Sequence, residues 1–216
     1  MARRGPDRLA VLIANARDSV PEGDPRRALL RRAESMARRA AAVIRAQASR
    51  INELESLVET DPLTGLLNRR GLLRRLVERL AEAARHGEPG VVMFCDMDGL
   101  KSINDRFGHA AGDLAIRTAA AAIRGCVRAT DTVARIGGDE FAILMSRIDA
   151  ERGLLLASRL SAAIRRLDLE WNGERAPLGL SVGIAAFSGG EDPEALLARA
   201  DHAMYAEKRS ARRVAA

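Results

Sequence analysis

The chain has 216 residues, of which 47% are hydrophobic and 30% are charged, so it can bury the core of one ordinary domain and carry an extension. No apolar run reaches the roughly 18 residues of a membrane-spanning helix. No apolar stretch follows the first arginines as it would in a secretory signal. The composition argues against membrane and secreted proteins, and we expect a cytoplasmic protein without a membrane partner.

The net charge of +6 is unevenly distributed. Residues 1–50 contain twelve arginines and five acidic residues, which leaves the rest of the chain close to neutral. A basic extension could bind nucleic acid or an anionic membrane. We favour a simpler interpretation, a solvated basic helix, and expect no nucleic-acid partner.

Residues 1–24 predict a short N-terminal segment. The apolar stretch 8–17 is typical of a short helix, and Pro21, Gly23 and Pro25 then interrupt the chain.

Residues 25–60 predict one long helix, because no Gly or Pro occurs between Arg26 and Thr60. Apolar and small residues recur there in alternating steps of three and four, which is a heptad seam. The seam residues are Leu30, Ala33, Ala37, Ala40, Ile44, Gln47, Ile51, Leu54 and Val58. So narrow a seam suits a second helix, so we expect a parallel coiled-coil homodimer. The alternative is a helix that packs on its own domain.

Residues 61–216 alternate between helical and strand patterns. Asp61-Pro62 ends the long helix, because proline disfavours helical geometry in the residue before it. The expected helices cover 69–86, 100–106, 112–128, 149–167 and 193–209, and the expected strands cover 91–95, 132–136, 140–145 and 178–187. Gly137-Gly138-Asp139 is a hairpin signal between two strands. This order predicts an α+β fold with a mainly antiparallel sheet.

The two cysteines, Cys95 and Cys126, are too few for a disulfide framework or a zinc site. Cys95 lies in an apolar strand pattern and Cys126 in a helical pattern. We expect two buried free thiols.

Carboxylates follow two of the predicted strands. Asp96 and Asp98 end the first strand, and Asp139 and Glu140 lie at the hairpin tip. If these strands are neighbours, the carboxylates meet at one edge and could hold Mg²⁺, which prefers oxygen ligands. Such a metal could bridge nucleotide phosphates and activate a hydroxyl. The alternative is structural: Asp98 caps the next helix, and Gly-Gly-Asp is a solvated turn.

Five segments together resemble the GGDEF domain of diguanylate cyclases. Gly137-Gly138-Asp139-Glu140-Phe141 spells the family signature in full. The other segments are the opening motif at 61–70, the metal and nucleotide segment at 96–109, Gly112-Asp113, and the closing helix at 200–208. The resemblance covers roughly residues 60–213. Five motifs in order at family spacing are much more specific than one signature.

The resemblance implies a fold like the palm of nucleotide cyclases and polymerases, a ferredoxin-like sheet with flanking helices, over residues 61–216. It implies an enzyme that condenses two GTP molecules into cyclic di-GMP with Mg²⁺ (or Mn²⁺). Asp96, the backbone of Met97, Asp139 and Glu140 would hold the metal. Asp139 or Glu140 would also assist deprotonation of the GTP 3′-hydroxyl, and the sequence leaves open which of them does so.

The same resemblance implies the substrate contacts. Asn104 and Asp113 would bind guanine, whose donors and acceptors match an amide and a carboxylate. The remaining implied contacts are the backbone at Asp98, Gly99 and Leu100, the glycines Gly137 and Gly138, and the cations Lys101, Lys208 and Arg212. The chain has only two lysines, and both fall on positions that the family uses for triphosphate. Leu100 departs from the family, which often has Phe there.

Arg128-Ala129-Thr130-Asp131, five residues before Gly137, resembles the family's RxxD inhibitory site, which binds the product. Arg159 is a candidate second contact. The alternative is an arginine at a helix end that pairs locally with Asp131.

Two other functions stay open at this point. The domain could bind GTP or cyclic di-GMP without catalysis. Alternatively, the basic helix could make the chain an interaction protein.

Overall fold

The computed structural model describes the backbone of residues 6–214 and the side-chain surroundings of residues 8–50 and 58–209. The chain divides into two compact units, Met1–Val58 and Glu59–Ala216. No helix within the described residues is both long and apolar enough to span a membrane.

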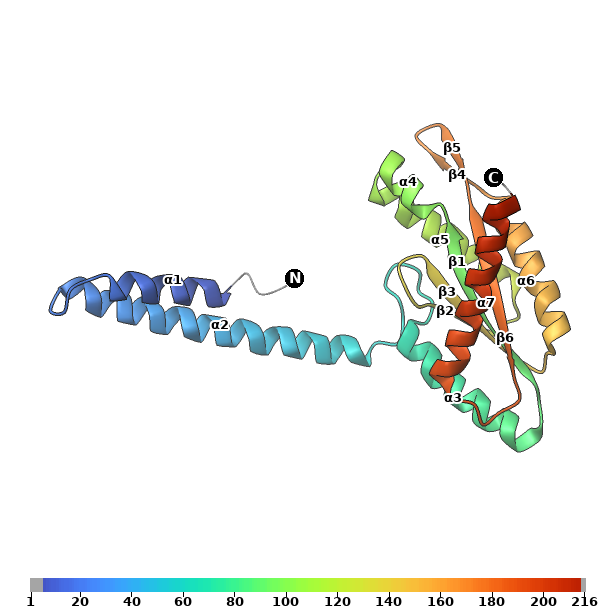
Figure 1. Ribbon diagram of the computed structural model, residues 1–216, viewed down its shortest axis with the longest axis horizontal. Helices are drawn as coiled ribbons and strands as arrows, with labels where there is room; N and C mark the ends of the chain where they lie inside the picture. Colours follow the sequence, from blue (N-terminus) through green and yellow to red (C-terminus); the bar gives the residue numbers. More distant parts are fainter. Residues whose placement is uncertain (1–5, 215–216) are drawn as a thin grey trace. The chain divides into compact units, whose positions relative to one another are not determined.

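The first unit is a hairpin of two helices, α1 (Pro6–Asp18) and α2 (Pro25–Leu57), that pack against each other (Figure 1). Both helices were predicted from the sequence. Asp24 begins α2 by accepting a 2.8 Å hydrogen bond from the backbone N–H of Arg26.

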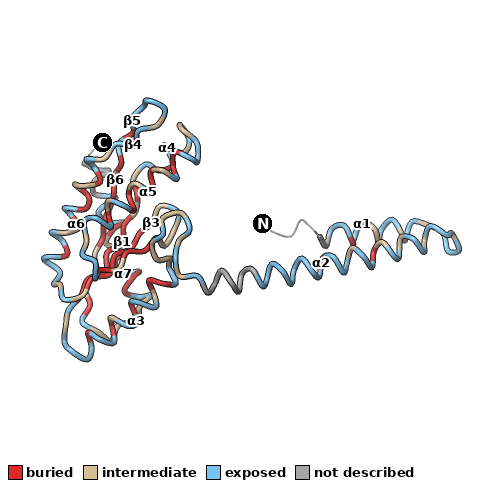
Figure 2. Tube along the Cα trace, turned by 180° about the vertical axis from the view of Figure 1, so that it is seen from behind, coloured by how far each residue is buried: buried red, intermediate tan, exposed pale blue. Residues whose placement is uncertain are grey.

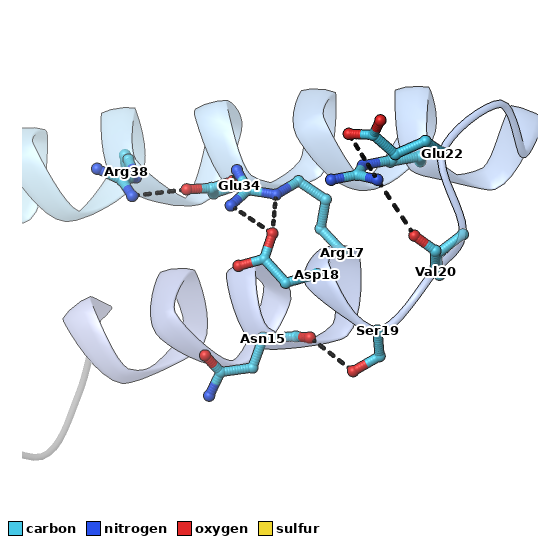
Figure 3. A network of polar contacts seen from close by, with 9 residues as sticks. Asn15, Arg17, Asp18, Ser19, Val20, Glu22, Glu34 and Arg38 are labelled. Carbon is cyan, nitrogen blue, oxygen red and sulfur yellow. Dashed lines mark hydrogen bonds and ion pairs between the residues drawn. The ribbon is translucent and has the colours of Figure 1, made fainter.

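One stripe of each helix is turned toward the other. The covered side chains of α1 are Ala10, Ile13, Ala14 and Arg17, and those of α2 are Arg27, Leu30, Ala33, Glu34, Ala37 and Ala41. Glu34 is buried and pairs with Arg17 of α1 and Arg38 of its own helix (Figure 3). Because a buried carboxylate needs its partners, these pairs fix the register of the hairpin.

Part of the predicted heptad seam therefore lies against α1. Leu30, Ala33 and Ala37 are partly covered within the hairpin, whereas Ala40, Ile44 and Gln47 are exposed. The seam residues Ile51 and Leu54 lie outside the described side chains. The coiled-coil dimer itself stays a prediction.

The second unit is an α+β domain around a four-stranded antiparallel sheet of order β2-β3-β1-β6. The strands are β1 (Gly90–Asp98), β2 (Thr132–Arg135), β3 (Glu140–Ser146) and β6 (Gly179–Phe187). The helices are α3 (Arg69–His86), α4 (Leu100–Phe107), α5 (His109–Cys126), α6 (Ala150–Arg165) and α7 (Pro193–Val214).

Helices cover both faces of the sheet. Successive side chains of a strand point to opposite faces. Val91, Met93 and Cys95 of β1 accordingly pack with α5 and α6, while Val92 and Phe94 pack with α3 and α7. The central strands are therefore buried along most of their length (Figure 2).

A small hairpin, formed by β4 (Asp168–Trp171) and β5 (Glu174–Pro177), was not predicted from the sequence. Its strands are short and largely polar, so no hydrophobic alternation marks them. The available signal was the turn Asn172-Gly173, where both residues have positive φ, 51° and 82°. Asn-Gly is the preferred sequence for such a tight hairpin turn.

The prediction for Cys126 was wrong, since this cysteine is exposed while Cys95 is buried. The buried stripe of α5 runs from Ala111 to Ile123. Cys126 is the last residue of the helix, where the packed stripe has already ended.

Candidate active site

Two acidic segments meet at one edge of the sheet. Asp96 of β1 lies opposite Glu140 of β3, and the backbone N–H of Met97 donates a 3.0 Å hydrogen bond to the carbonyl of Asp139. Asp96, Asp139 and Glu140 are all half-buried. The structure thus brings together three of the carboxylates that the sequence analysis selected.

The hairpin between β2 and β3 leaves room for the Glu140 side chain. The N–H groups of Ile136 and Gly137 both point to the carbonyl of Glu140, at 2.9 and 3.4 Å. A Cβ on Gly137 would lie 2.0 Å from Oε2 of Glu140. Any larger residue at position 137 would therefore displace this carboxylate.

Lys208 of α7 reaches the same edge. Its ammonium group pairs with Asp96 and lies 3.7 Å from Oδ1 of Asp98. The helix can approach β6 closely because Gly183 has no side chain, and a Cβ there would lie 2.0 Å from the backbone nitrogen of Met204. A cation from the end of the chain is thereby placed among carboxylates from its middle.

The electrostatics of the edge favour an additional cation. Burial raises the pKa of Asp96, Lys208 opposes this shift, and the charges of Asp139 and Asp98 add to it. Burial also raises the pKa of Glu140, and the neighbouring charges of Asp139 and Asp96 raise it further. A divalent cation would relieve this repulsion, and carboxylate oxygens are the ligands that Mg²⁺ prefers.

No preformed metal cage accompanies these carboxylates. Among the residues whose side chains are described, no three His, Cys, Asp or Glu side chains are arranged as a metal-binding group. The metal set of Asp96, the Met97 backbone, Asp139 and Glu140 remains a prediction that the donor chemistry fits.

Asp98 is held by β6, a contact that the sequence did not suggest. Its Oδ1 accepts a 2.8 Å hydrogen bond from the hydroxyl of Ser181, and Gly179 lies opposite it in the strand register. Gly99 follows with φ of 77°, which a glycine adopts readily, and α4 begins at Leu100.

The two candidate guanine contacts lie where α4 and α5 meet. Asn104 packs so closely on α5 that a Cβ on Gly112 would lie 1.9 Å from its side-chain oxygen. Asp113 is the next residue and is exposed. An amide and a carboxylate are therefore near neighbours beside an accessible surface. Lys101 on α4 is also exposed, and the side chain of Arg212 lies outside the described residues.

Arg135 is a site residue that sequence reasoning missed. Its guanidinium donates to the carbonyl of Gly138 at 2.7 Å and to the carboxylate of Asp61 at 3.1 Å. It thereby links the signature hairpin to the opening motif, where Asp61 also accepts from the backbone N–H and the hydroxyl of Thr64. An arginine two residues before Gly137 and an aspartate at the motif's start were the available signals.

A cavity of about 320 Å³ lies near the other end of the β2–β3 hairpin. Arg128, Asp131 and Arg159, the three candidate product contacts, all line it. Asp131 is buried and accepts a 2.9 Å hydrogen bond from the backbone N–H of Arg128, so the loop is ordered by its own residues. Cys126 lines the same cavity.

Comparison with known proteins identifies the family. Residues 58–213 match the model of the diguanylate cyclase GGDEF domain. The chain belongs to the GGDEF diguanylate cyclase family.

Individual relatives agree with this assignment. The chain is 40% identical over 185 residues to the diguanylate cyclase DgcP of Pseudomonas aeruginosa. The matched region covers 86% of this chain and 27% of DgcP. It spans about a quarter to a third of the length of the curated relatives it matches.

Two solved structures extend the likeness into the N-terminal helices. The diguanylate cyclase SiaD of Pseudomonas aeruginosa, solved with its activator SiaC, is 30% identical with a TM-score of 0.68 over 94% of this chain and 80% of SiaD. The coiled coil and GGDEF domain of DgcB from Caulobacter crescentus, solved with cyclic di-GMP, is 27% identical with a TM-score of 0.67 over 82% of this chain and 94% of that chain.

Proposed function

We propose that the protein is an active diguanylate cyclase that converts two GTP molecules into cyclic di-GMP and two pyrophosphates. The observation that carries this proposal is the edge of the sheet, where Asp96 lies opposite Glu140 and Lys208 reaches the carboxylates from α7. This arrangement supplies oxygen donors for a metal and a cation for phosphate at one place. The family, whose relative DgcP is a diguanylate cyclase, supports it.

The chain's own residues would carry out three tasks. Asn104 and Asp113 hold the guanine edge and so orient the nucleotide. Lys208, Lys101 and Arg212 neutralise the triphosphate, whose charge would otherwise keep it from the carboxylates.

Asp139 or Glu140 assists removal of the proton from the attacking 3′-hydroxyl. The raised pKa of Glu140 makes it a better proton acceptor than an ordinary glutamate. Mg²⁺ (or Mn²⁺), held by Asp96, the Met97 backbone, Asp139 and Glu140, would stabilise charge on the reacting phosphate.

The reaction requires two domains, because each holds one GTP and each 3′-hydroxyl attacks the other nucleotide. We therefore propose a homodimer formed through the N-terminal helices. DgcB, which has a coiled coil before its GGDEF domain, is a precedent for this organisation.

We also propose that the product restrains the enzyme at the cavity lined by Arg128, Asp131 and Arg159. An arginine fork matches a phosphodiester, and the carboxylate matches guanine N–H groups. DgcB, solved with cyclic di-GMP, supports product binding in this family.

Incubation with GTP and Mg²⁺ followed by nucleotide chromatography tests the activity. Cyclic di-GMP and pyrophosphate should accumulate, and Asp139→Ala and Glu140→Ala should each abolish them because the metal or the hydroxyl loses a partner. Glu151→Ala removes an exposed carboxylate from α6 and should leave turnover unchanged. Unchanged turnover in both site variants would overturn the assignment, and nucleotide binding without turnover would indicate a non-catalytic module.

A further inference from the structure

The N-terminal hairpin keeps an apolar face that α1 and α2 do not cover themselves. Leu9 and Leu12 of α1 and Leu29, Met36 and Val43 of α2 are each between 55% and 71% exposed. Long side chains of this kind are ordinarily exposed one at a time, and a contiguous set marks an interaction surface.

On α2 these residues form a second heptad stripe beside the one that contacts α1. Leu29, Ala33, Met36, Ala40 and Val43 follow in alternating steps of four and three. Ala33, at the edge next to α1, is partly covered, and the other four are exposed. At roughly 100° per residue they fall within an arc of roughly 80°. The contact with α1 thus uses one stripe of α2 and leaves a coiled-coil seam next to it.

The exposed leucines of α1 lie on the same side of the hairpin. On each helix, the exposed apolar side chains are displaced around the helix axis from those that contact the other helix. The displacement has the same direction on both helices and amounts to roughly a quarter to almost half a turn. In an antiparallel pair this rotation places both sets on one side. The Arg17–Glu34 pair sets the register, which brings Leu9 to the level of Val43 and Leu12 close to Met36.

Charged residues lie opposite this face or along its margins, where Arg8 of α1 stands beside Leu9 and Leu12. Arg31 and Arg38 project from the opposite side of α2, and Arg32 and Arg39 border the stripe. In a parallel pair of α2 helices, residues on one edge of the stripe, such as Arg32 and Arg39, face residues on the opposite edge of the partner's stripe. Those residues in a second copy are uncharged, being Leu30, Ala37 and Ile44. The α2 helices of two copies can therefore meet without opposing Arg32 and Arg39, despite the basic character of the segment.

We infer that this face, Leu9, Leu12, Leu29, Ala33, Met36, Ala40 and Val43, binds the same face of a second copy of the chain and forms a four-helix bundle. A second copy is the expected occupant because the face is a self-matching heptad stripe without charge. The α2 helices run parallel, because both catalytic domains follow their C-terminal ends and must meet; this orientation rests on the proposed function. This seam shares Ala33 and Ala40 with the one expected from the sequence. It uses Leu29, Met36 and Val43 in place of Leu30, Ala37 and Ile44, because α1 partly covers Leu30 and Ala37.

Sedimentation of the intact chain tests the surface. The wild type should dimerise, and Met36→Glu and Leu12→Glu should each weaken the dimer at least about tenfold, because each buries an unpaired charge. Ser35→Glu and Asn15→Glu add the same charge to exposed positions on the other sides of the helices and should change little. Circular dichroism controls for loss of the helices.

Disulfide trapping provides a second readout that does not depend on tolerating a charge. In a Cys126→Ser background, Met36→Cys should form a cross-linked dimer on oxidation, whereas Ser35→Cys should not, because a disulfide needs Cα atoms within about 7 Å. Cys95 is buried and does not compete.

A monomeric wild type, equal weakening by site and control variants, or trapping through Ser35→Cys would overturn the inference. None of these measurements requires GTP. A failure of the interface is therefore distinguishable from a failure of the proposed activity.

Discussion

Asp96 and Glu140 lie opposite each other on neighbouring strands although both are acids. Like charges directly across an antiparallel pair destabilise a sheet. Lys208 offsets this for Asp96 but pairs less directly with the rest of the cluster. This repulsion therefore destabilises the folded domain, and a bound cation would relieve it.

Replacing Glu140 with Gln should stabilise the folded protein in the absence of divalent cations. A raised pKa means that ionisation of Glu140 costs free energy in the folded state. The cost is absent below the ordinary glutamate value of 4.5 and grows as the pH rises through the raised pKa. Thermal unfolding should give Glu140→Gln a higher Tm than wild type at pH 7, and each 1 kcal/mol corresponds to about 2–4 °C.

Three controls make this measurement specific. The difference in Tm should shrink toward pH 4.5, and Mg²⁺ should raise the Tm of wild type more than that of Glu140→Gln. Glu151→Gln, an exposed carboxylate outside the cluster, should leave the Tm within error. A Tm for Glu140→Gln at or below wild type at pH 7 would show that the carboxylate is not under repulsion.

Single residues also show how far the sequence predicted the site. Asp96 and Glu140 could be selected in advance, because both lie at the ends of recognisable strands. Ser181 and Arg135 could not, since their partners Asp98 and Asp61 are 83 and 74 positions away. Their roles depend on the pairing of β6 with β1 and on the path of the opening motif, which local patterns do not encode.

At the scale of elements, periodic segments were predicted and non-periodic ones were not. Helices α3, α6 and α7 and the central strand β1 have strong apolar patterns, and the predicted ranges overlap them closely. The β4–β5 hairpin has polar strands held mainly by their own pairing. In α2 the apolar periodicity was clear, but two adjacent stripes fit a heptad, one through Leu30 and Ala37 and one through Leu29 and Met36. Which of them stays available to a second helix depends on where α1 packs, and this cannot be predicted from α2 alone.

The loop after α5 and helix α6 form the proposed product site, and one arginine should separate its function from catalysis. Arg128→Ala should leave the initial rate of turnover nearly unchanged, because the cavity lies apart from the proposed catalytic carboxylates. The same variant should no longer slow down as cyclic di-GMP accumulates. Calorimetry without GTP should show loss of cyclic di-GMP binding. This is coupling between two sites.

Arg117→Ala is the matched control for that experiment. Arg117 is an exposed arginine of α5 that does not line the cavity, so its loss changes the charge but not the proposed site. The proposal is contradicted if wild-type progress curves show no product inhibition or if Arg128→Ala is fully inhibited. In either case Arg128 and Asp131 only stabilise the local turn.

The chain divides into two compact units, and the proposed function places assembly in the first and chemistry in the second. Deletion of residues 1–57 keeps the contacts that anchor the start of the second unit. Glu59 accepts 2.6 Å hydrogen bonds from Arg74, and Asp61 pairs with Arg135. The catalytic unit should therefore fold without residues 1–57.

Removing residues 1–57 should make activity strongly dependent on protein concentration. Two catalytic domains must meet in the proposed reaction, and the proposed dimer of the N-terminal helices would hold them at an effective concentration in the millimolar range. Without the helices, specific activity at micromolar protein should be low and rise steeply with concentration, while the intact chain changes little. Turnover measured across a dilution series, with circular dichroism to confirm folding, gives the comparison.

Met36→Glu in the intact chain should reproduce the behaviour of the deletion, since it removes the same contact, and Ser35→Glu should behave as wild type. High activity of the shortened protein at every concentration would show that the catalytic domains dimerise unaided.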